Sequence, residues 1–306
     1  MSLLKFKALA DDTRIRLLWI LFHYELSVNE LVQILGMGQS RVSRHLKILS
    51  EAGLLQSRRD GLWVFYSCPA AGTHADFLNA ILPFLPALPI METDLVMAGH
   101  MLAERARRTR QFFNAMAENW DELNREVLGS FDLHSHVLEA MPQPCPVAVD
   151  LGCGTGTMLE KMQYKAGMSI GVDGSASMLD LCRERLGAFG NAISLRIGEL
   201  SHLPLADNEA NFACINLVLH HLPEPALAFN EIKRILAPDG TLFIADFLRH
   251  QDESMRLRYG DHWLGFERED LEKFLKESCF TMQKTEVCQV GRKLSLILIT
   301  AVPAAQ

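Results

Sequence analysis

The sequence predicts an α-helical domain that ends in a β-hairpin, followed by an α/β domain with a mainly parallel sheet. Three observations predict this fold class. The 306 residues are more than a single domain usually holds. Residues 1–70 combine helical periodicity with two short strand-like runs. From residue 146 onward, apolar strand-like runs alternate with helical stretches, which indicates parallel strands covered by helices on both faces.

The first helices are expected over residues 2–10 and 13–24, where apolar side chains recur at helical spacing. Asp12 lies just before the second helix and is its expected N-cap, because a carboxylate can accept hydrogen bonds from the unpaired amides of a first turn. Ser27 and Glu30 have the spacing of a capping box, which predicts the start of a third, short helix.

The elements that follow are a short helix, a further helix and a β-hairpin. The short helix is expected to end at Gly36, and the next helix is expected over residues 40–52. Two strand-like runs, residues 54–59 and 62–67, flank Asp60-Gly61, a pair typical of tight β-hairpins. Helix, short helix, helix and hairpin are the elements of a winged helix-turn-helix domain, which binds DNA through its last helix.

The helix expected at residues 40–52 has an apolar stripe, formed by Val42, Leu46 and Leu49, and a polar face. Arginine and glutamine can contact guanine and adenine edges in the major groove, and serine and lysine can hold phosphates. The candidate DNA-contacting residues are Gln39, Ser40, Arg41, Ser43, Arg44, Lys47, Arg58 and Arg59. The alternative is that this polar face is an ordinary solvent-exposed helix surface that binds nothing. The net charge of +3 over residues 1–70 is too small to decide between DNA binding and this alternative.

Three segments, Ala8–Leu18, Gln39–Leu49 and Ala52–Leu55, resemble the ArsR family of winged-helix repressors over about residues 5–68. The resemblance implies a homodimer that binds palindromic operators in double-stranded DNA and dimerises through helices outside the winged fold. Its metal-sensing members carry Cys-Val-Cys where this chain has Ser27-Val28-Asn29. Because the thiolates are missing, no soft-metal site is expected there, and none is predicted elsewhere in the chain.

The remaining residues divide into a helical region and the α/β domain. Pro83, Pro86 and Pro89 precede a long amphipathic helix expected over residues 92–118. The expected strands are residues 147–151, 169–173, 193–197, 212–219 and 241–246, with an antiparallel edge pair at 281–287 and 294–302. The expected domains are the DNA-binding domain at 1–70, a dimerisation, linker and cap region at 71–140, and the α/β domain at 141–306.

The first strand of the α/β domain leads into a glycine-rich turn, Asp150-Leu-Gly-Cys-Gly-Thr-Gly156. Glycines let a ligand lie against the backbone, and Asp150 suits an ammonium group rather than a pyrophosphate. Asp173 ends the second strand, where a carboxylate can accept both ribose hydroxyls, and Glu199 follows the third, where it could meet an adenine amino group. The candidate ligand-binding residues are Asp150, Gly152, Cys153, Gly154, Gly156, Asp173, Gly174, Met178, Gly198, Glu199, Leu200 and Asn216.

These residues, together with segments 219–223 and 235–242, resemble class I S-adenosylmethionine-dependent methyltransferases over residues 146–250. Residues 110–113 and 119–121 resemble the cap helix of small-molecule methyltransferases of the ubiquinone-biosynthesis type. The resemblance implies a Rossmann-like sheet and S-adenosylmethionine or S-adenosylhomocysteine as the ligand. Phe212-Ala213 departs from the usual Phe-Asp, which puts the geometry on the substrate side in doubt.

His220 and His221 are weak candidates for a catalytic base, since such a pair can equally be local packing.

A DNA-binding domain without metal ligands needs another effector. The combination of such a domain with a methyltransferase-like domain resembles ArsR-type regulators that respond to S-adenosylhomocysteine and control methionine-cycle genes. The expected function is therefore a repressor of such genes. The alternative is an active small-molecule methyltransferase with an autoregulatory DNA-binding head. An aromatic side chain in the methyl pocket would favour the demethylated ligand, and the candidates are Trp120, Phe131, Trp263 and Phe266.

The seven cysteines are scattered and form no CxxC pair, which suits a reducing compartment. The N-terminus lacks a signal-peptide pattern, and no apolar run is long enough for a membrane span. We therefore expect a cytoplasmic protein with no membrane partner.

Overall fold

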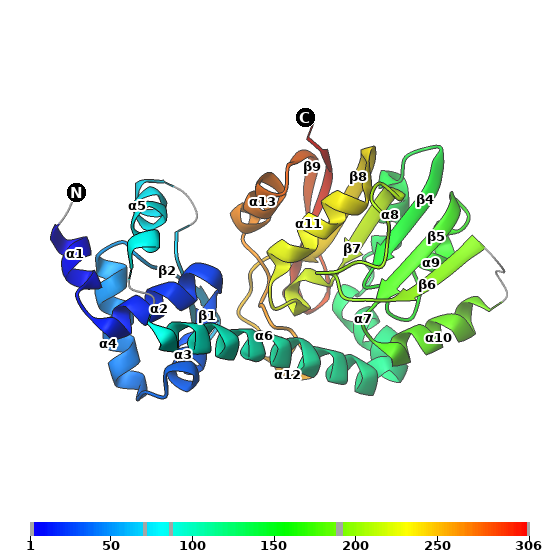
Figure 1. Ribbon diagram of the computed structural model, residues 1–306. Helices are drawn as coiled ribbons and strands as arrows, with labels where there is room; N and C mark the ends of the chain where they lie inside the picture. Colours follow the sequence, from blue (N-terminus) through cyan, green and yellow to red (C-terminus); the bar gives the residue numbers. More distant parts are fainter. Residues whose placement is uncertain (1–2, 70–71, 86–87, 188–191, 305–306) are drawn as a thin grey trace. The chain divides into compact units, whose positions relative to one another are not determined.

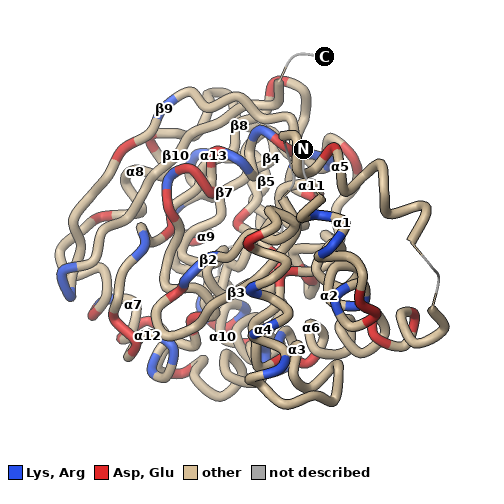
Figure 2. Tube along the Cα trace, turned by 90° about the vertical axis from the view of Figure 1, so that its left-hand side faces the viewer, with Lys and Arg blue, Asp and Glu red and all other residues tan. Residues whose placement is uncertain are grey.

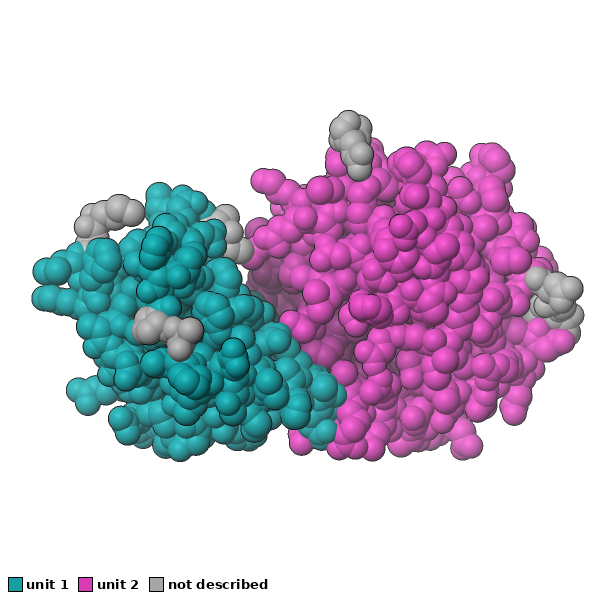
Figure 3. Space-filling view, viewed as in Figure 1, with its two compact units in different colours: residues 1–105 teal, residues 106–306 magenta. Residues whose placement is uncertain are grey.

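The structure is a computed structural model that describes residues 3–69, 72–85, 88–187 and 192–304. The chain forms two compact units, Met1–Arg105 and Ala106–Gln306, drawn in teal and magenta in Figure 3. The region expected at residues 71–140 is divided between these two units. None of the helices in the described ranges combines the length and the hydropathy that crossing a bilayer requires.

The first unit begins with a winged helix-turn-helix arrangement. Its helices are α1 (Leu3–Leu9), α2 (Asp12–His23), α3 (Val28–Leu35) and α4 (Gln39–Glu51). Its strands, β1 (Leu26–Ser27), β2 (Gln56–Asp60) and β3 (Trp63–Ser67), pair antiparallel in the order β1-β3-β2. Asp60 pairs with Trp63 across the hairpin, and Gly61 in the turn has a φ of 57°.

Two helix starts in this unit show how local sequence sets the fold. The capping box of α3 is present, with Glu30 accepting from the Ser27 amide at 2.8 Å. The N-cap of α2 is Asp11 rather than the predicted Asp12, because Asp11 has an extended backbone and accepts from the Arg14 amide at 3.1 Å. Two adjacent aspartates fit the capping pattern equally well in the sequence, so only the backbone conformation separates them.

Two further helices complete the first unit, α5 (Thr73–Ile81) with the short η1 (Leu82–Phe84), and α6 (Pro89–Met116), whose last residues belong to the second unit. Helix α6 begins three residues before the predicted start, because a proline is well tolerated at the first helical position. Arg16 binds Asp94 of α6 through two hydrogen bonds of 2.7 and 2.8 Å. This ion pair fixes α6 to the winged domain.

The second unit contains a seven-stranded sheet. Its strands are β4 (Cys145–Leu151), β5 (Ala166–Asp173), β6 (Ile193–Ile197), β7 (Ala210–Asn216), β8 (Leu236–Phe247), β9 (Phe280–Gln289) and β10 (Ser295–Pro303). They lie in the order β6-β5-β4-β7-β8-β10-β9, and β10 is antiparallel to both of its neighbours. Strands β4 to β9 are labelled in Figure 1. The predicted parallel sheet with an antiparallel C-terminal edge is confirmed.

Helices cover both faces of this sheet. The helices described in the second unit include η2 (Ala117–Asn119), α7 (Trp120–Leu128), α8 (Leu133–Ala140), α9 (Leu159–Met162), α10 (Ala176–Leu186), η4 (Leu219–His221), α11 (Pro225–Ile235), α12 (Ser254–Arg258), α13 (Arg268–Glu277) and η5 (Gly291–Lys293). Ala148, Phe212 and Phe243 pack in one core with the apolar residues of α7 and α8. Val149 and Ile215, at alternate strand positions, are equally buried, so the sheet has no solvent-facing side at its centre.

Candidate functional site

Helix α4 presents one face to the core of the first unit and the opposite face to solvent. Val42, Leu46 and Leu49 are fully buried, as the apolar stripe predicted. The side chains predicted to contact DNA from this helix are all exposed, namely Gln39, Ser40, Arg41, Ser43, Arg44 and Lys47. Figure 2 marks the basic positions of this helix in blue. An exposed polar helix surface with basic residues is suited to the major groove of DNA.

The two arginines of the wing differ in environment. Arg58 donates from Nε to Glu25 Oε1 at 3.1 Å, and its side chain is mostly buried beside the ring of Phe65. Arg59 is exposed and donates to the carbonyl of Gly61 at 3.1 Å. Arg58 therefore has a structural role within the unit, which its sequence position beside Arg59 did not indicate.

The candidate ligand-binding residues of the second unit gather at the carboxyl ends of neighbouring parallel strands. Asp150 is the second-last residue of β4, and the glycine turn follows this strand. Asp173 ends β5, Gly198 follows β6, and Asn216 ends β7. Strands β5 and β7 pair with β4 on its two sides, so the chain order reverses at β4. Ligands of open α/β sheets bind at such a switch point.

The backbone conformation and the packing of the turn are what mainly require glycine at these positions. Gly152, Gly154 and Gly156 all have a positive φ, of 74°, 51° and 83°. A Cβ on Gly152 would lie 2.5 Å from Val218 Cγ2, and one on Gly156 would lie 2.4 Å from Cys182 Sγ. Packing alone therefore excludes a side chain at Gly152 and Gly156, and the expectation that these glycines also make room for a ligand stays a prediction. A Cβ on Gly154 would instead lie 3.7 Å from the Trp120 ring.

Asp173 holds the glycine turn in place. Its Oδ2 accepts from the Gly154 amide at 2.9 Å and its Oδ1 accepts from the Ser175 amide at 2.8 Å. Burial raises the pKa of Asp173, and these amide hydrogen bonds oppose that rise. The carboxylate links the end of β5 to the turn after β4 and keeps lone pairs for further donors.

Asp150 is buried beside β7. The Cys214 thiol donates to its Oδ1 at 3.4 Å, and the Asn216 side chain also hydrogen-bonds to it. Burial raises the pKa of Asp150 to about 7, despite these two donors. The Oδ1 atom of Asn216 is buried and has no hydrogen-bond partner among the described residues. A cationic donor placed here would satisfy both acceptors.

The other candidate ligand-binding residues differ in exposure. Glu199 is half exposed and forms an ion pair with Arg110 of α6. Met178 and Leu200 are buried, while Gly174 lies beside the Arg110 side chain and Gly198 beside Pro204. Cys153 is also buried, and the neighbouring Cys182 thiol together with burial raises its pKa well above the ordinary value.

A cap formed by the start of α7 lies on the glycine turn. Thr155 hydrogen-bonds to Asp121, and Arg185 of α10 binds both of these side chains. The Trp120 ring borders Gly154 and meets the Phe113 ring edge to face at 5.0 Å. The sequence resemblance placed Trp120 and Asp121 in a cap segment, but no local pattern identified Arg185 as their partner.

The two histidines are enclosed. His220 is 2% exposed and its Nδ1 lies 2.7 Å from Asp246 Oδ1, while His221 is 4% exposed and packs on Phe113 at 4.8 Å. Burial opposes the charge of His220, but Asp246 and Asp261 outweigh it and raise its pKa. Burial and His220 hold the pKa of His221 well below its usual range. Sequence reasoning missed Asp261, which lies in an irregular segment without a repeating pattern.

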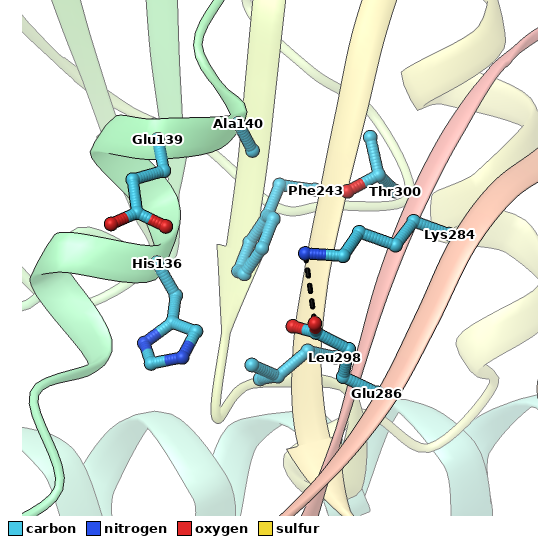
Figure 4. Close-up of a pocket in the computed structure, with 8 residues that line it drawn as sticks. All are labelled: His136, Glu139, Ala140, Phe243, Lys284, Glu286, Leu298 and Thr300. Atoms are coloured by element: carbon cyan, nitrogen blue, oxygen red, sulfur yellow. Dashed lines mark ion pairs between the residues drawn. The ribbon is translucent and has the colours of Figure 1, made fainter.

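A separate pocket of about 210 Å³ lies between α8 and strands β8, β10 and β9 (Figure 4). His136, Phe243 and Thr300 are among its lining residues, and Lys284 Nζ pairs with Glu286 Oε1 at 2.8 Å on its wall. None of the residues predicted to bind a ligand lines this pocket. It is therefore distinct from the carboxyl ends of the strands.

Comparison with known proteins matches each unit to a different family. Residues 11–57 match the family model of bacterial regulatory proteins of the arsR family, and residues 149–244 match that of the methyltransferase domain. The arsenic resistance transcriptional regulator ArsR1 of Pseudomonas putida is 53% identical over 62 residues, which are 20% of this chain and 48% of that protein.

The second unit matches other relatives. A demethylmenaquinone methyltransferase of Lactiplantibacillus plantarum is 33% identical over 140 residues, covering 42% of this chain and 58% of that enzyme. One from Symbiobacterium thermophilum is 27% identical over 171 residues, covering 53% and 68%. The chain spans between about a third and two thirds of the length of the curated relatives it matches.

Solved structures share the fold of the second unit. The [4+2]-cyclase SpnF has a TM-score of 0.56 at 15% identity, covering 64% of this chain and 95% of that one. Geranyl diphosphate C-methyltransferase of Streptomyces coelicolor, solved with Mg²⁺, geranyl diphosphate and S-adenosyl-L-homocysteine, has a TM-score of 0.51 at 13% identity, covering 56% and 77%. The chain therefore joins a segment that matches the arsR family model to one that matches the methyltransferase domain model.

Proposed function

We propose that this protein is a cytoplasmic transcriptional regulator that binds operator DNA through α4 and takes S-adenosylhomocysteine, or S-adenosylmethionine, as its effector. One observation carries the proposal: a single chain combines an exposed polar and basic α4 with a glycine turn framed by Asp150 and Asp173. The regulated genes would be those of the methionine cycle, because the concentrations of these two nucleosides depend on the flux through that cycle.

The first unit supplies the DNA-binding half of the proposal. The exposed residues of α4 offer donors for base edges, and the wing carries the exposed Arg59, which would contact the DNA backbone. Apolar side chains that a lone unit leaves exposed include Leu3 and Phe6 of α1 and Val96 and Met97 of α6. Their burial in a homodimer would place two copies of α4 on a palindromic operator.

The second unit supplies the effector half. Asp150 would pair with the ligand ammonium group, whose charge favours the ionised carboxylate that burial disfavours. Asp173 has lone pairs left for ribose hydroxyls after accepting from two amides. Glu199 would meet the adenine amino group, in place of its present partner Arg110.

The surroundings of the turn support an effector role over catalysis. Trp120 borders Gly154, where a bulky aromatic would favour a ligand without the sulfonium methyl. His220 and His221 are buried beneath aromatic rings, so neither ring is presented to an acceptor. A general base must come within hydrogen-bond reach of its substrate.

Helix α6 offers a route between the two sites. Arg105 binds Glu30 of the α3 capping box within the first unit, with Nε 2.6 Å from Glu30 Oε1. Five positions later on the same helix, Arg110 binds Glu199 within the second unit. A ligand that takes Glu199 would release Arg110 and so change the contacts of the helix that holds α3. Such differential contacts are what an effector needs to shift an equilibrium.

The test is a titration of the purified full-length protein on the DNA upstream of its own gene, with and without each nucleoside. The regulator is supported if S-adenosylhomocysteine changes the operator affinity about tenfold or more and Asp173→Ala removes the change. An operator affinity unaffected by both nucleosides would discard the effector role. Methyl transfer to a small-molecule acceptor by the same protein would support the enzyme alternative.

A further inference from the structure

Three buried side chains of the second unit converge just after β7. His220 and His221 belong to η4, and Asp261 lies in the segment after α12. One donor atom from each lies within 4.8 Å of the donors of the other two. Within the described ranges, no other group of three or more histidine, cysteine or carboxylate side chains meets this condition. All three side chains are almost completely withdrawn from solvent.

The hydrogen bonds within this cluster leave Asp261 without a donor. Both carboxylate oxygens of Asp261 are buried without a hydrogen-bond partner among the described residues. His220 Nδ1 and Asp246 Oδ1 are 2.7 Å apart, so the ring donates its Nδ1 proton there. The remaining lone pair, on His220 Nε2, then faces Asp261 Oδ1 at 3.6 Å. Two buried acceptors facing each other are unfavourable unless something positive lies between them.

The separations distinguish a proton from a metal ion. A proton shared between nitrogen and oxygen gives a spacing of about 2.7–3.2 Å, and 3.6 Å is too long. A zinc ion binds nitrogen and oxygen at about 2.0–2.2 Å, so tetrahedral donors lie roughly 3.4 Å from one another. The spacing of 3.6 Å from Asp261 Oδ1 to His220 Nε2 is close to that value. His221 Nδ1 lies 4.0 Å from Asp261 Oδ1 and 3.2 Å from the Gly260 carbonyl oxygen, so it would give up this hydrogen bond to bind the ion.

We propose that His220, His221 and Asp261 bind one divalent transition-metal ion, with Asp246 orienting His220. Two imidazoles and a carboxylate suit Zn²⁺ and its neighbours in the first transition row. A carboxylate that accepts the other ring proton of a ligating histidine is the usual outer partner of such sites. The ion would join η4 to the segment after α12. This proposal is independent of the effector role and departs from the expectation of a metal-free chain.

The test uses the untagged full-length protein, purified without chelators, stripped of metal, and then titrated with Zn²⁺ and with Co²⁺. We expect one equivalent of Zn²⁺ per chain and a rise in melting temperature on its return. Cobalt should give visible d–d bands without the thiolate charge-transfer band that cysteine ligands produce. Failure of the stripped wild-type protein to take up stoichiometric Zn²⁺, or a cobalt spectrum with thiolate bands, would overturn the proposal.

The variants His221→Asn and Asp261→Asn keep the polarity and approximate size of the side chains. Each should weaken Zn²⁺ binding at least tenfold, whereas the exposed His202→Asn should bind one equivalent as the wild type does. Retention of full zinc affinity in both cluster variants would overturn the proposal. If either variant fails to fold, as judged by circular dichroism, the wild-type zinc content and cobalt spectrum decide the question on their own.

Discussion

Asp150 couples ligand binding to pH at the scale of a single residue. Its pKa of about 7 lies above the ordinary 3.8, so between these pH values the folded state binds a proton that the unfolded state has lost. The contribution of this group to the free energy of unfolding therefore falls as pH rises from about 4 to about 7, and is constant above that. An ammonium ligand requires the ionised form.

We therefore predict that the affinity for S-adenosylhomocysteine falls as pH drops below about 7, by up to about tenfold per pH unit. Calorimetric titration between about pH 5.5 and 8.5 measures this. Asp150→Asn should bind more weakly and with an almost flat pH profile. An equally steep profile in Asp150→Asn would assign the titration to another group.

The glycine turn allows a matched comparison of two residues. Gly152→Ala places a methyl group 2.5 Å from Val218 Cγ2 at a positive φ, whereas Gly154→Ala meets nothing closer than the Trp120 ring at 3.7 Å. Both variants carry the strain of a left-handed alanine, about 1–2 kcal/mol, but only the first adds a clash. Gly152→Ala should be the less stable variant by about 1–3 kcal/mol in urea unfolding. Equal stabilities would show that Val218 moves aside freely.

Residue types could be predicted from the sequence better than residue roles. The spacing of Asp150 and Asp173 identified both carboxylates, because their positions at strand ends follow from the strand pattern. The pairing of Arg58 with Glu25 depends on how the hairpin folds back on the chain, and no local pattern encodes it. Asp261 was missed for the same reason, since its partners lie forty residues earlier in the sequence.

At the scale of elements, α4 permits substitutions that change binding without changing stability. Arg44 and Lys47 are exposed on its polar face, so Arg44→Ala and Lys47→Ala should leave the melting temperature almost unchanged. Arg44→Ala should cost about 1–3 kcal/mol of operator binding and relax base preference, while Lys47→Ala should mainly lower the salt dependence. Arg268→Ala on α13 is the control, and gel-shift titrations against operator variants measure all three. Unchanged binding in both α4 variants would remove α4 from the interface.

Helix α6 carries two ion pairs that differ in burial. Arg105 and Glu30 are mostly buried, so Arg105→Ala should lower the free energy of unfolding of the first unit by about 2–4 kcal/mol. Arg110 and Glu199 are about half exposed, and Arg110→Ala should change the stability by less than about 1 kcal/mol. Arg110→Ala should nevertheless reduce the operator response to ligand. Urea unfolding measures the stabilities, and gel-shift titration measures the change in operator affinity on adding ligand. If Arg110→Ala leaves that change unaltered, coupling through α6 is excluded.

Element identity followed from periodicity, while element ends depended on packing. The strands of the sheet were predicted because central parallel strands are apolar throughout. Strand β8 begins at Leu236 rather than near Thr241, because Leu236 pairs with Ala210 before a register shift. That extra pairing depends on the neighbouring strand β7, and no local sequence pattern in the residues before Thr241 indicates it.

At the scale of the whole molecule, the fold class and the two units could be predicted because each unit has its own sequence pattern and its own buried core. The boundary between Arg105 and Ala106 could not, since it falls inside the continuous helical pattern of α6. Helical periodicity reports which face of α6 is apolar, but not which core covers each part of it.

The regulator proposal makes one prediction that only the intact chain can test. Linkage requires that, if S-adenosylhomocysteine weakens operator binding by a given factor, operator DNA weakens S-adenosylhomocysteine binding by the same factor. Calorimetric titration of the nucleoside into the protein alone and into its operator complex measures the second factor, and gel-shift titration measures the first. Asp173→Ala is expected to abolish both. Factors that disagree beyond error would mean that the nucleoside acts on a process other than operator affinity, such as dimer assembly, because a direct coupling between two sites has a single free energy.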